Sequence, residues 1–306
     1  MSADFAPGYL RLPRRELQAR AESLLQLLSP CGLCPRLCGA RRDAGEHGVC
    51  RGARRAKVSS YNLHFGEEPC LVGRGGSGTI FLAGCNLGCK FCQNYPISHL
   101  GHGVDASPEK LAQMMLSLQA EGAENINFVT PTHFTAQLVE ALAIARDHGL
   151  RLPLVWNSGG YERVEVLRLL DGIVDIYLPD AKYSDNGVAA SLSNAPDYVE
   201  VNRAVLAEMW RQVGPLQIQG CAAVRGLLVR HLVLPERLES TRGVLTFLAG
   251  LDAQRRVAVS VMAQYFPAYL ALEDPTLNRR VSREEWRQVR AWVEELGLSE
   301  GYVQER

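Results

Sequence analysis

Short apolar runs alternate with amphipathic segments over most of the chain. Buried strands are predicted for the apolar runs at 126–129, 152–156, 173–178, 227–234 and 257–262, and a β-like run at 79–83 precedes them. Helix-length segments with apolar stripes separate most of the runs, as at 136–146 and 198–213. This alternation predicts an α/β fold with parallel strands and right-handed crossovers. Six such units are too few to close an eight-stranded barrel, so a partial barrel is expected.

Residues that start and stop helices mark three further elements. A helix with leucines on one side is predicted over 13–28. Ser107 followed by Pro108 predicts an N-cap and the first residue of a second helix. Ser282 and Glu285 form a capping-box pattern at the start of a last helix.

Three cysteines lie close together directly after the run at 79–83. Cys85, Cys89 and Cys92 have the spacing x3 and x2 on one short loop, and each thiolate can hold one iron of a 4Fe–4S cube. A cube usually takes four cysteines, so three leave one iron open for another ligand. An open position is typical of a metal site that does chemistry.

The triad resembles the signature of the radical S-adenosylmethionine (SAM) superfamily, Cys-x3-Cys-x-aromatic-Cys, with Phe91 at the aromatic position. The likeness runs from about residue 63 to 269 and is closest to pyruvate formate-lyase activating enzyme-like proteins, in particular the PflX-like iron–sulfur group. The segments that resemble this group most clearly are HFGEEPC, NINFVTPTHF, VDIYLPDAKY and RGLLVRHLVLP. The resemblance implies a partial (βα)6 TIM-like barrel with its active site at the carboxyl ends of the strands.

The resemblance also implies an activity and partners. In the superfamily the open iron is chelated by SAM, whose reductive cleavage gives a 5′-deoxyadenosyl radical that abstracts a hydrogen atom. The activating-enzyme likeness implies a glycine of a partner protein as the substrate and a flavodoxin- or ferredoxin-like electron donor. Modification of a small molecule or a peptide is the alternative within enzymes. A non-catalytic electron carrier or metal-binding scaffold is the alternative outside them.

Polar residues follow the second predicted strand where the superfamily often has Gly-Gly-Glu. Thr130 and Thr132 stand there, and with backbone carbonyls they could replace the missing glutamate in binding the cofactor. His133 is either an acid/base that faces the substrate or a histidine of the barrel wall.

The next strand ends also resemble activating enzymes. Asn157 and Ser158 lie in a stretch similar to their Thr-Asn-Gly, which implies contacts with SAM. Asp180 and Lys182 match their Asp-x-Lys, although the two could form only an ion pair at the strand end.

Arg230 and His231 alternate along the fifth predicted strand, so only one of them can point into the barrel. Arg230 is the better candidate for cofactor binding, because a guanidinium can bind both oxygens of a carboxylate.

A second cysteine set precedes the barrel. Cys31, Cys34, Cys38 and Cys50 lie within twenty residues between turn-forming Gly and Pro. Four thiolates can close a tetrahedral shell around zinc or surround an auxiliary 4Fe–4S cluster, and unligated thiols are the third possibility. Cys70 is expected to be a buried thiol, or else a further ligand.

Composition adds limits. The chain has 306 residues and a formal net charge of zero, so no overall electrostatic field attracts it to nucleic acid or to an anionic membrane surface. No run is long enough to span a membrane, and no signal peptide is visible, so a cytoplasmic location is expected. Nine cysteines in a reducing compartment favour metal ligands over disulfides, with Cys221 expected as a small core residue. The predicted division is a metal-binding region at 1–62, the radical SAM core at 63–270 and a helical extension at 271–306.

Overall fold

The computed structural model describes residues 5–304. The strands are β1 (Ala56–His64), β2 (Ser77–Leu82), β3 (Val104–Ala106), β4 (Ile126–Val129), β5 (Leu154–Ser158), β6 (Ile176–Pro179), β7 (Gln217–Gln219), β8 (Ala222–Leu232), β9 (Ala258–Met262) and β10 (Gly301–Val303). The α-helices are α1 (Gly8–Arg11), α2 (Arg14–Gln26), α3 (Pro69–Val72), α4 (Tyr95–Ser98), α5 (Pro108–Ala120), α6 (Thr135–Asp147), α7 (Val164–Leu169), α8 (Asn186–Ser193), α9 (Tyr198–Val213), α10 (Leu238–Leu251) and α11 (Arg283–Glu295). Short 3-10 turns are η1 (Arg42–Ala44), η2 (Thr132–Phe134) and η3 (Tyr269–Leu272).

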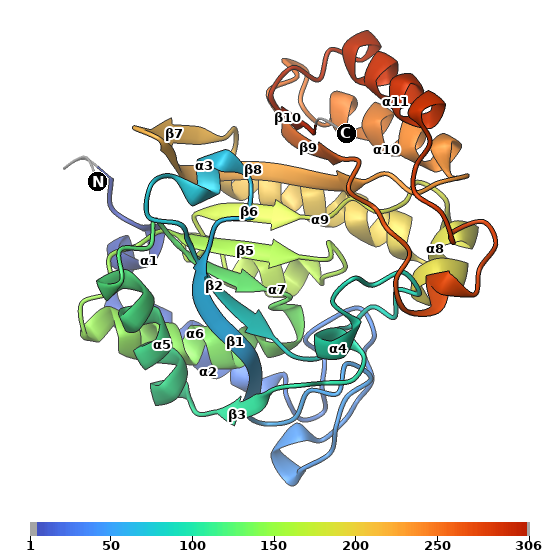
Figure 1. Ribbon diagram of the computed structural model, residues 1–306. Coiled ribbons are helices and arrows are strands. Elements are labelled where there is room, and N and C mark those ends of the chain that lie inside the picture. Colours follow the sequence, from blue (N-terminus) through green and yellow to red (C-terminus); the bar gives the residue numbers. More distant parts are fainter. Residues whose placement is uncertain (1–4, 305–306) are drawn as a thin grey trace.

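Six parallel strands form the centre of one sheet (Figure 1). They lie side by side in the order β2, β4, β5, β6, β8 and β9, which is their order along the chain. The predicted partial (βα)6 barrel is therefore confirmed. Strands β1 and β3 extend the β2 edge in antiparallel pairing, and β10 extends the β9 edge in parallel. The sheet path ends at β3 and β10, which leaves the barrel open.

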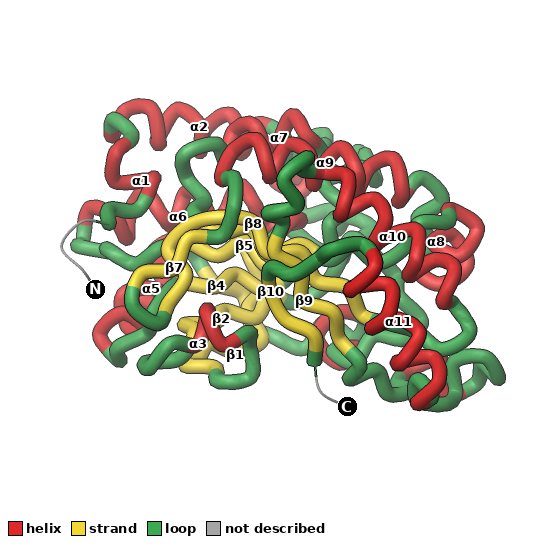
Figure 2. Tube along the Cα trace, turned by 90° about the horizontal axis from the view of Figure 1, so that it is seen from above, coloured by secondary structure: helices red, strands yellow, loops and turns green. Residues whose placement is uncertain are grey.

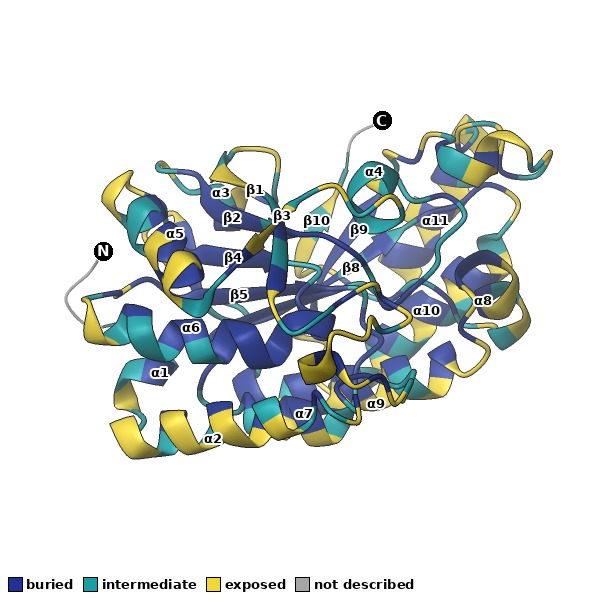
Figure 3. Cartoon of the chain, turned by 90° about the horizontal axis from the view of Figure 1, so that it is seen from below, coloured by how far each residue is buried: buried dark blue, intermediate teal, exposed yellow. Residues whose placement is uncertain are grey.

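The helices cover the outer face of this curved sheet. Figure 2 shows the strands as an arc, with α2, α6, α7 and α9 on the convex side and α3 on the concave side. Helix α2 packs on α6 and α7, and α3 contacts β8 inside the curve. Figure 3 shows buried inner faces on these helices and an exposed outer face along α2. No helix within residues 5–304 is long and apolar enough to cross a membrane.

Two apolar clusters hold the fold together. The larger lies between the helices and the sheet, as expected for strands that bury both faces. The smaller fills the lower part of the barrel and is made of Cys70, Leu71, Val155, Ile176, Leu178, Ala223, Leu228 and Ala258. Helix α3 thus plugs the barrel with its own side chains, and the space above this plug is left to polar residues.

Element boundaries follow local chemistry. The N-cap at Ser107 and the capping box of Ser282 with Glu285 are both present. Strand β5 begins two residues after the predicted start, beyond Pro153, which has no N–H for the sheet. The apolar pair at 173–174 belongs to the turn after α7, so β6 begins only at Ile176. Strand β1 runs across residues 62 and 63, and the division of the chain into three regions stays a prediction.

Candidate functional site

The cysteine triad lies on the loop between β2 and α4, at the carboxyl end of β2. The Leu87 N–H donates to Cys85 Sγ at 3.3 Å, and the Ser193 hydroxyl donates to Cys89 Sγ at 2.9 Å. Cys92 is half-buried on the same loop. The loop therefore presents its sulfur atoms at the end of the barrel where parallel α/β folds place their active sites.

These thiols fit an iron–sulfur cluster. Burial raises the pKa of Cys85, and Cys89 adds to this, so the apo thiol stays protonated until a metal displaces the proton. Burial also raises the pKa of Cys89, against the opposing charge of Lys182. Within residues 5–304 no three His, Cys, Asp or Glu side chains converge around one ion. Cube ligands need no such convergence, because each thiolate binds a different iron.

Neighbouring segments hold the loop from two sides. The Lys90 N–H donates to the Leu192 carbonyl of α8 at 2.8 Å, and the Ala271 N–H of η3 donates to the Lys90 carbonyl at 3.0 Å. Phe91 is only 6% exposed and packs edge to face with Tyr265, with ring centroids 6.2 Å apart. The signature aromatic residue thus anchors the loop to the segment after β9.

A network of charged and polar side chains lies inside the barrel between the plug and the triad. Arg230 donates to Asn157 Oδ1 at 2.6 Å, to Asp180 Oδ1 at 3.3 Å and to Glu67 Oε2 at 3.3 Å. Lys182 Nζ lies 2.5 Å from Asp180 Oδ2. The structure therefore joins four residues of three strand ends, all expected at the site, with one that was not expected, Glu67.

The electrostatics of this network follow from its pairing. Burial raises the pKa of Asp180, but Lys182 and Arg230 outweigh burial and the net pKa is lowered. Burial raises the pKa of Glu67, and Arg230 opposes this only in part. Burial lowers the pKa of Lys182, yet the charges of Asp180 and Cys89 raise it overall. Lys182 therefore stays protonated and places a positive charge beside Cys89.

Alternation along β8 decides between its two polar residues. Arg230 points into the barrel, as expected. His231 points to the helix side, where Nδ1 lies 2.6 Å from the Ala181 carbonyl and Nε2 lies 3.0 Å from the Thr241 hydroxyl of α10. His231 is therefore a packing residue between β8 and α10.

The threonines after β4 and the serine of β5 are placed differently from Asn157. Thr130 has a positive φ of 60°, and its N–H donates to the Asn157 carbonyl at 2.8 Å. The Thr132 hydroxyl and the Trp156 indole N–H donate to Glu162 Oε1, each at 2.8 Å, and Ser158 lies near the same carboxylate. Thr132 and Ser158 thus meet at a buried carboxylate on the helix side, and contact of either with SAM stays a prediction.

His133 is a histidine of the wall. It is fully buried, and its Nε2 lies 2.9 Å from the Ala83 carbonyl at the end of β2. Burial lowers the pKa of His133 to about 4, so the ring is neutral. Of the two alternatives that the sequence leaves open, the structure favours the structural one.

The N-terminal cysteines come together beside the triad loop. Cys31, Cys34 and Cys50 are buried and Cys38 is half-buried. The thiol of Cys34 contacts the side chain of Asn86, which lies between two cysteines of the triad. In Figure 1 this blue segment runs below α4.

The two remaining cysteines differ. Cys70 is buried in α3, as expected. The prediction that Cys221 lies in the core is wrong, because Cys221 is exposed in the turn between β7 and β8. Its chain neighbour Gly220 has a positive φ of 65°, which marks a tight hairpin turn with no core beneath it.

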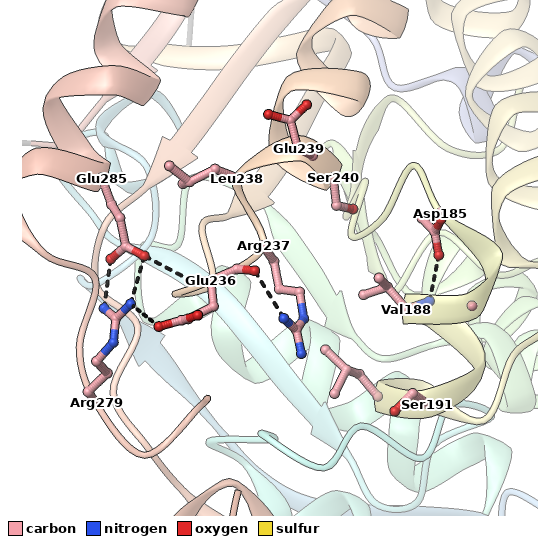
Figure 4. A pocket seen from close by; sticks show the side chains of 12 residues that line it. Asp185, Val188, Ser191, Glu236, Arg237, Leu238, Glu239, Ser240, Arg279 and Glu285 are labelled. Carbon is pink, nitrogen blue, oxygen red and sulfur yellow. Dashed lines mark hydrogen bonds and ion pairs between the residues drawn. The ribbon is translucent and has the colours of Figure 1, made fainter. Parts of the chain in front are cut away.

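An open groove of about 810 Å³ lies next to the site, between α8, the start of α10 and the start of α11. Figure 4 shows Ser191 and Val188 of α8 on one wall, Leu238 and Ser240 of α10 above, and the Arg279–Glu285 ion pair on the far side. Helix α8 separates the groove from the triad, since its last residue contacts Cys89.

Comparisons with known proteins agree with this geometry. The family model of the radical SAM superfamily matches residues 79–205, from β2 into α9. The uncharacterized protein MJ0674 of Methanocaldococcus jannaschii is 31% identical over 283 residues, which are 88% of this chain and 75% of that protein.

Among solved structures, HydG, a maturase of the FeFe hydrogenase, is 10% identical with a TM-score of 0.53, covering 97% of this chain and 65% of HydG. TsrM, a radical SAM methyltransferase from Kitasatospora setae, is 17% identical with a TM-score of 0.44, covering 61% of this chain and only 34% of TsrM. The HydG likeness concerns the fold alone. The triad at the barrel mouth, the family match and the relative together show that the chain belongs to the radical SAM superfamily.

Proposed function

We propose that this chain is an activating-enzyme-like radical SAM enzyme that takes a hydrogen atom from a polypeptide substrate. When bound, the 4Fe–4S cluster and SAM supply reductive cleavage of the sulfonium to methionine and a 5′-deoxyadenosyl radical. Cys85, Cys89 and Cys92 hold the cluster in this proposal. The observation that carries it is the triad at the mouth of the barrel, with the ammonium of Lys182 beside Cys89.

The barrel network gives the chain's own residues roles toward SAM. Lys182 and Arg230 provide positive charge for a carboxylate, and Asn157 provides an amide already fixed by Arg230. Asp180 orients both cations through its two oxygens. Phe91 and Tyr265 keep the triad loop in place and help to exclude water.

A polypeptide substrate is supported by the shape of the site. The plug of α3 fills one end of the barrel with apolar side chains, and the Glu67–Arg230 pair lies above it. The open groove beside α8 can receive an extended segment of another chain. A glycine of such a partner, as in the activating enzymes that the sequence resembles, is the proposed acceptor. A flavodoxin- or ferredoxin-like protein in the cytoplasm is the proposed electron donor, in keeping with nine free cysteines.

The test begins with the reaction itself. Anaerobic, dithionite-reduced enzyme given SAM should release methionine and 5′-deoxyadenosine, which chromatography measures, and Cys89→Ala should abolish both. A fully iron-loaded enzyme that gives no 5′-deoxyadenosine above the variant's level would instead indicate an electron carrier.

The substrate class is tested by the stimulation of this reaction. The macromolecular fraction of a cell extract should stimulate 5′-deoxyadenosine release until a protease destroys the fraction. Ser191→Trp, in the groove, should weaken the stimulation, whereas Ala190→Trp, exposed on the same helix, should not. Stimulation by the small-molecule filtrate alone would favour the small-molecule alternative.

A further inference from the structure

The four N-terminal thiols form a preorganised cage. Cys31 and Cys38 lie close enough for each thiol to shift the pKa of the other. A Cβ placed on Gly48 would lie 3.3 Å from the Sγ atoms of both Cys38 and Cys50. The two sulfur atoms therefore lie on the same side of the Gly48 backbone, where the glycine has no side chain. The cage is closed by residues up to nineteen positions apart in the sequence.

Backbone N–H groups lie near all four sulfur atoms. The Gly52 N–H donates to Cys50 Sγ at 3.4 Å, and the N–H groups of Leu33, Arg36 and Ala40 lie near Cys31, Cys34 and Cys38. The triad residue Cys85 is held in the same way by Leu87. N–H groups close to sulfur stabilise the negative charge of metal-bound thiolates.

A buried arginine faces this cage without a carboxylate partner. Arg42 is 1% exposed; its Nη2 lies 3.0 Å from Cys50 Sγ and its Nη1 donates to the His133 carbonyl at 2.6 Å. No carboxylate of residues 5–304 pairs with Arg42, and its Nε has no hydrogen-bond partner. A buried unpaired cation is costly, so the fold requires an anion here.

We propose that Cys31, Cys34, Cys38 and Cys50 bind a second 4Fe–4S cluster and that Arg42 is its buried counter-cation. Four thiolates and a cube carry a net negative charge, which neutralises the guanidinium. Zinc fits less well, because a single ion needs its ligands converged and no three ligating side chains of residues 5–304 are so arranged. The inference does not depend on SAM cleavage at the triad.

The cluster is tested in the full-length Cys85→Ala/Cys89→Ala/Cys92→Ala variant, which lacks the triad. After anaerobic reconstitution it should hold about four irons per chain with matching sulfide, and it should give an electron paramagnetic resonance signal on reduction. A variant that holds one zinc and no iron would contradict the assignment of a cluster. A variant that binds no metal would contradict the assignment of a metal site to these four cysteines. Because the triad is gone, neither outcome bears on the proposed function.

The role of Arg42 is tested in the same background. A positive charge beside a cluster stabilises the reduced state, which is more negative. Arg42→Met removes this charge and should therefore lower the reduction potential of the remaining cluster. Arg41→Met is the matched control, since Arg41 is exposed and pairs with Glu46 outside the cage. An unchanged potential in Arg42→Met would overturn the counter-cation. If Arg42→Met loses its iron, Arg42→Lys should retain it; equal loss in both would also overturn the role.

Discussion

Arg230 of β8 and Asn157 of β5 are joined by a 2.6 Å hydrogen bond across the barrel, although β6 lies between their strands in the sheet. The same guanidinium contacts Asp180 and Glu67, so one side chain links the end of β5, the end of β6 and the plug. This end of the barrel is thus organised around one guanidinium.

Removal of that cation should cost stability. Arg230→Met leaves the carboxylates of Glu67 and Asp180 without their shared partner, and breaking such a buried pair costs about 3–5 kcal/mol. Unfolding in urea under anaerobic conditions measures the loss. Adding Glu67→Gln should restore part of it, because one uncompensated charge disappears. Arg280→Met, at an exposed arginine, should change little, and an equal loss there would contradict the assignment.

The central fold could be predicted because its signals are local. Buried parallel strands are continuous apolar runs, and this pattern located all six of them. Strands β7 and β10 are three residues long and lie at the surface, so they carry no such pattern. Strand β1 is half exposed and polar, and its antiparallel pairing with β2 becomes visible only in the folded sheet.

Of the candidate site, the part formed by a local motif could be predicted, and the part formed by residues distant in the sequence could not. The triad is a local motif, whereas the pair of Glu67 and Arg230 is 163 residues apart and depends on the plug. A carboxylate between Gly66 and the helix-starting Pro69 was the available signal for Glu67. Asn157 and Ser158 are neighbours on one strand, so alternation alone places them on opposite faces.

Lys182 should matter for SAM binding more than for the cluster. Lys182→Met removes the positive charge beside Cys89, while all three thiols remain. We expect an unchanged iron content and a SAM affinity reduced by about 1–3 kcal/mol, the cost of a hydrogen bond that involves a charged group. Equilibrium dialysis of reconstituted enzyme with labelled SAM measures the affinity. Equal affinity of the two proteins would exclude Lys182 as a contact.

His231 should make stability depend on pH. Burial lowers its pKa to about 4 from 6.5, so the unfolded chain binds the proton first. The contribution of neutral His231 to the free energy of unfolding is complete above pH 6.5 and is lost as the pH falls toward 4. The stability advantage of the wild type over His231→Leu should shrink by about 2 kcal/mol between pH 6.5 and 5. Urea unfolding at each pH measures the free energy of unfolding of both proteins. Effects of His133 or of cluster loss are the same in both proteins, so they cancel in the difference. Parallel curves would contradict the prediction.

Ser193 should tune the triad cluster through its hydroxyl. Ser193 donates to Cys89 Sγ at 2.9 Å, and its oxygen lies 2.5 Å from the Tyr183 hydroxyl, which fixes its orientation. Hydrogen bonds to cluster sulfur stabilise the reduced state, whose negative charge is larger. Ser193→Ala should therefore lower the reduction potential, by about 60 mV if the one-electron equilibrium constant changes tenfold.

The measurement is a redox titration followed by electron paramagnetic resonance in the Cys31→Ala/Cys34→Ala/Cys38→Ala/Cys50→Ala background, where the triad holds the only cluster expected. Ser191→Ala is the control, because Ser191 is exposed two residues earlier on the same helix. Tyr183→Phe should shift the potential in the same direction but less, since the serine keeps its bond to sulfur without its support. A Ser193→Ala potential equal to that of the control would show that the hydroxyl does not reach the ligand once the cluster is bound.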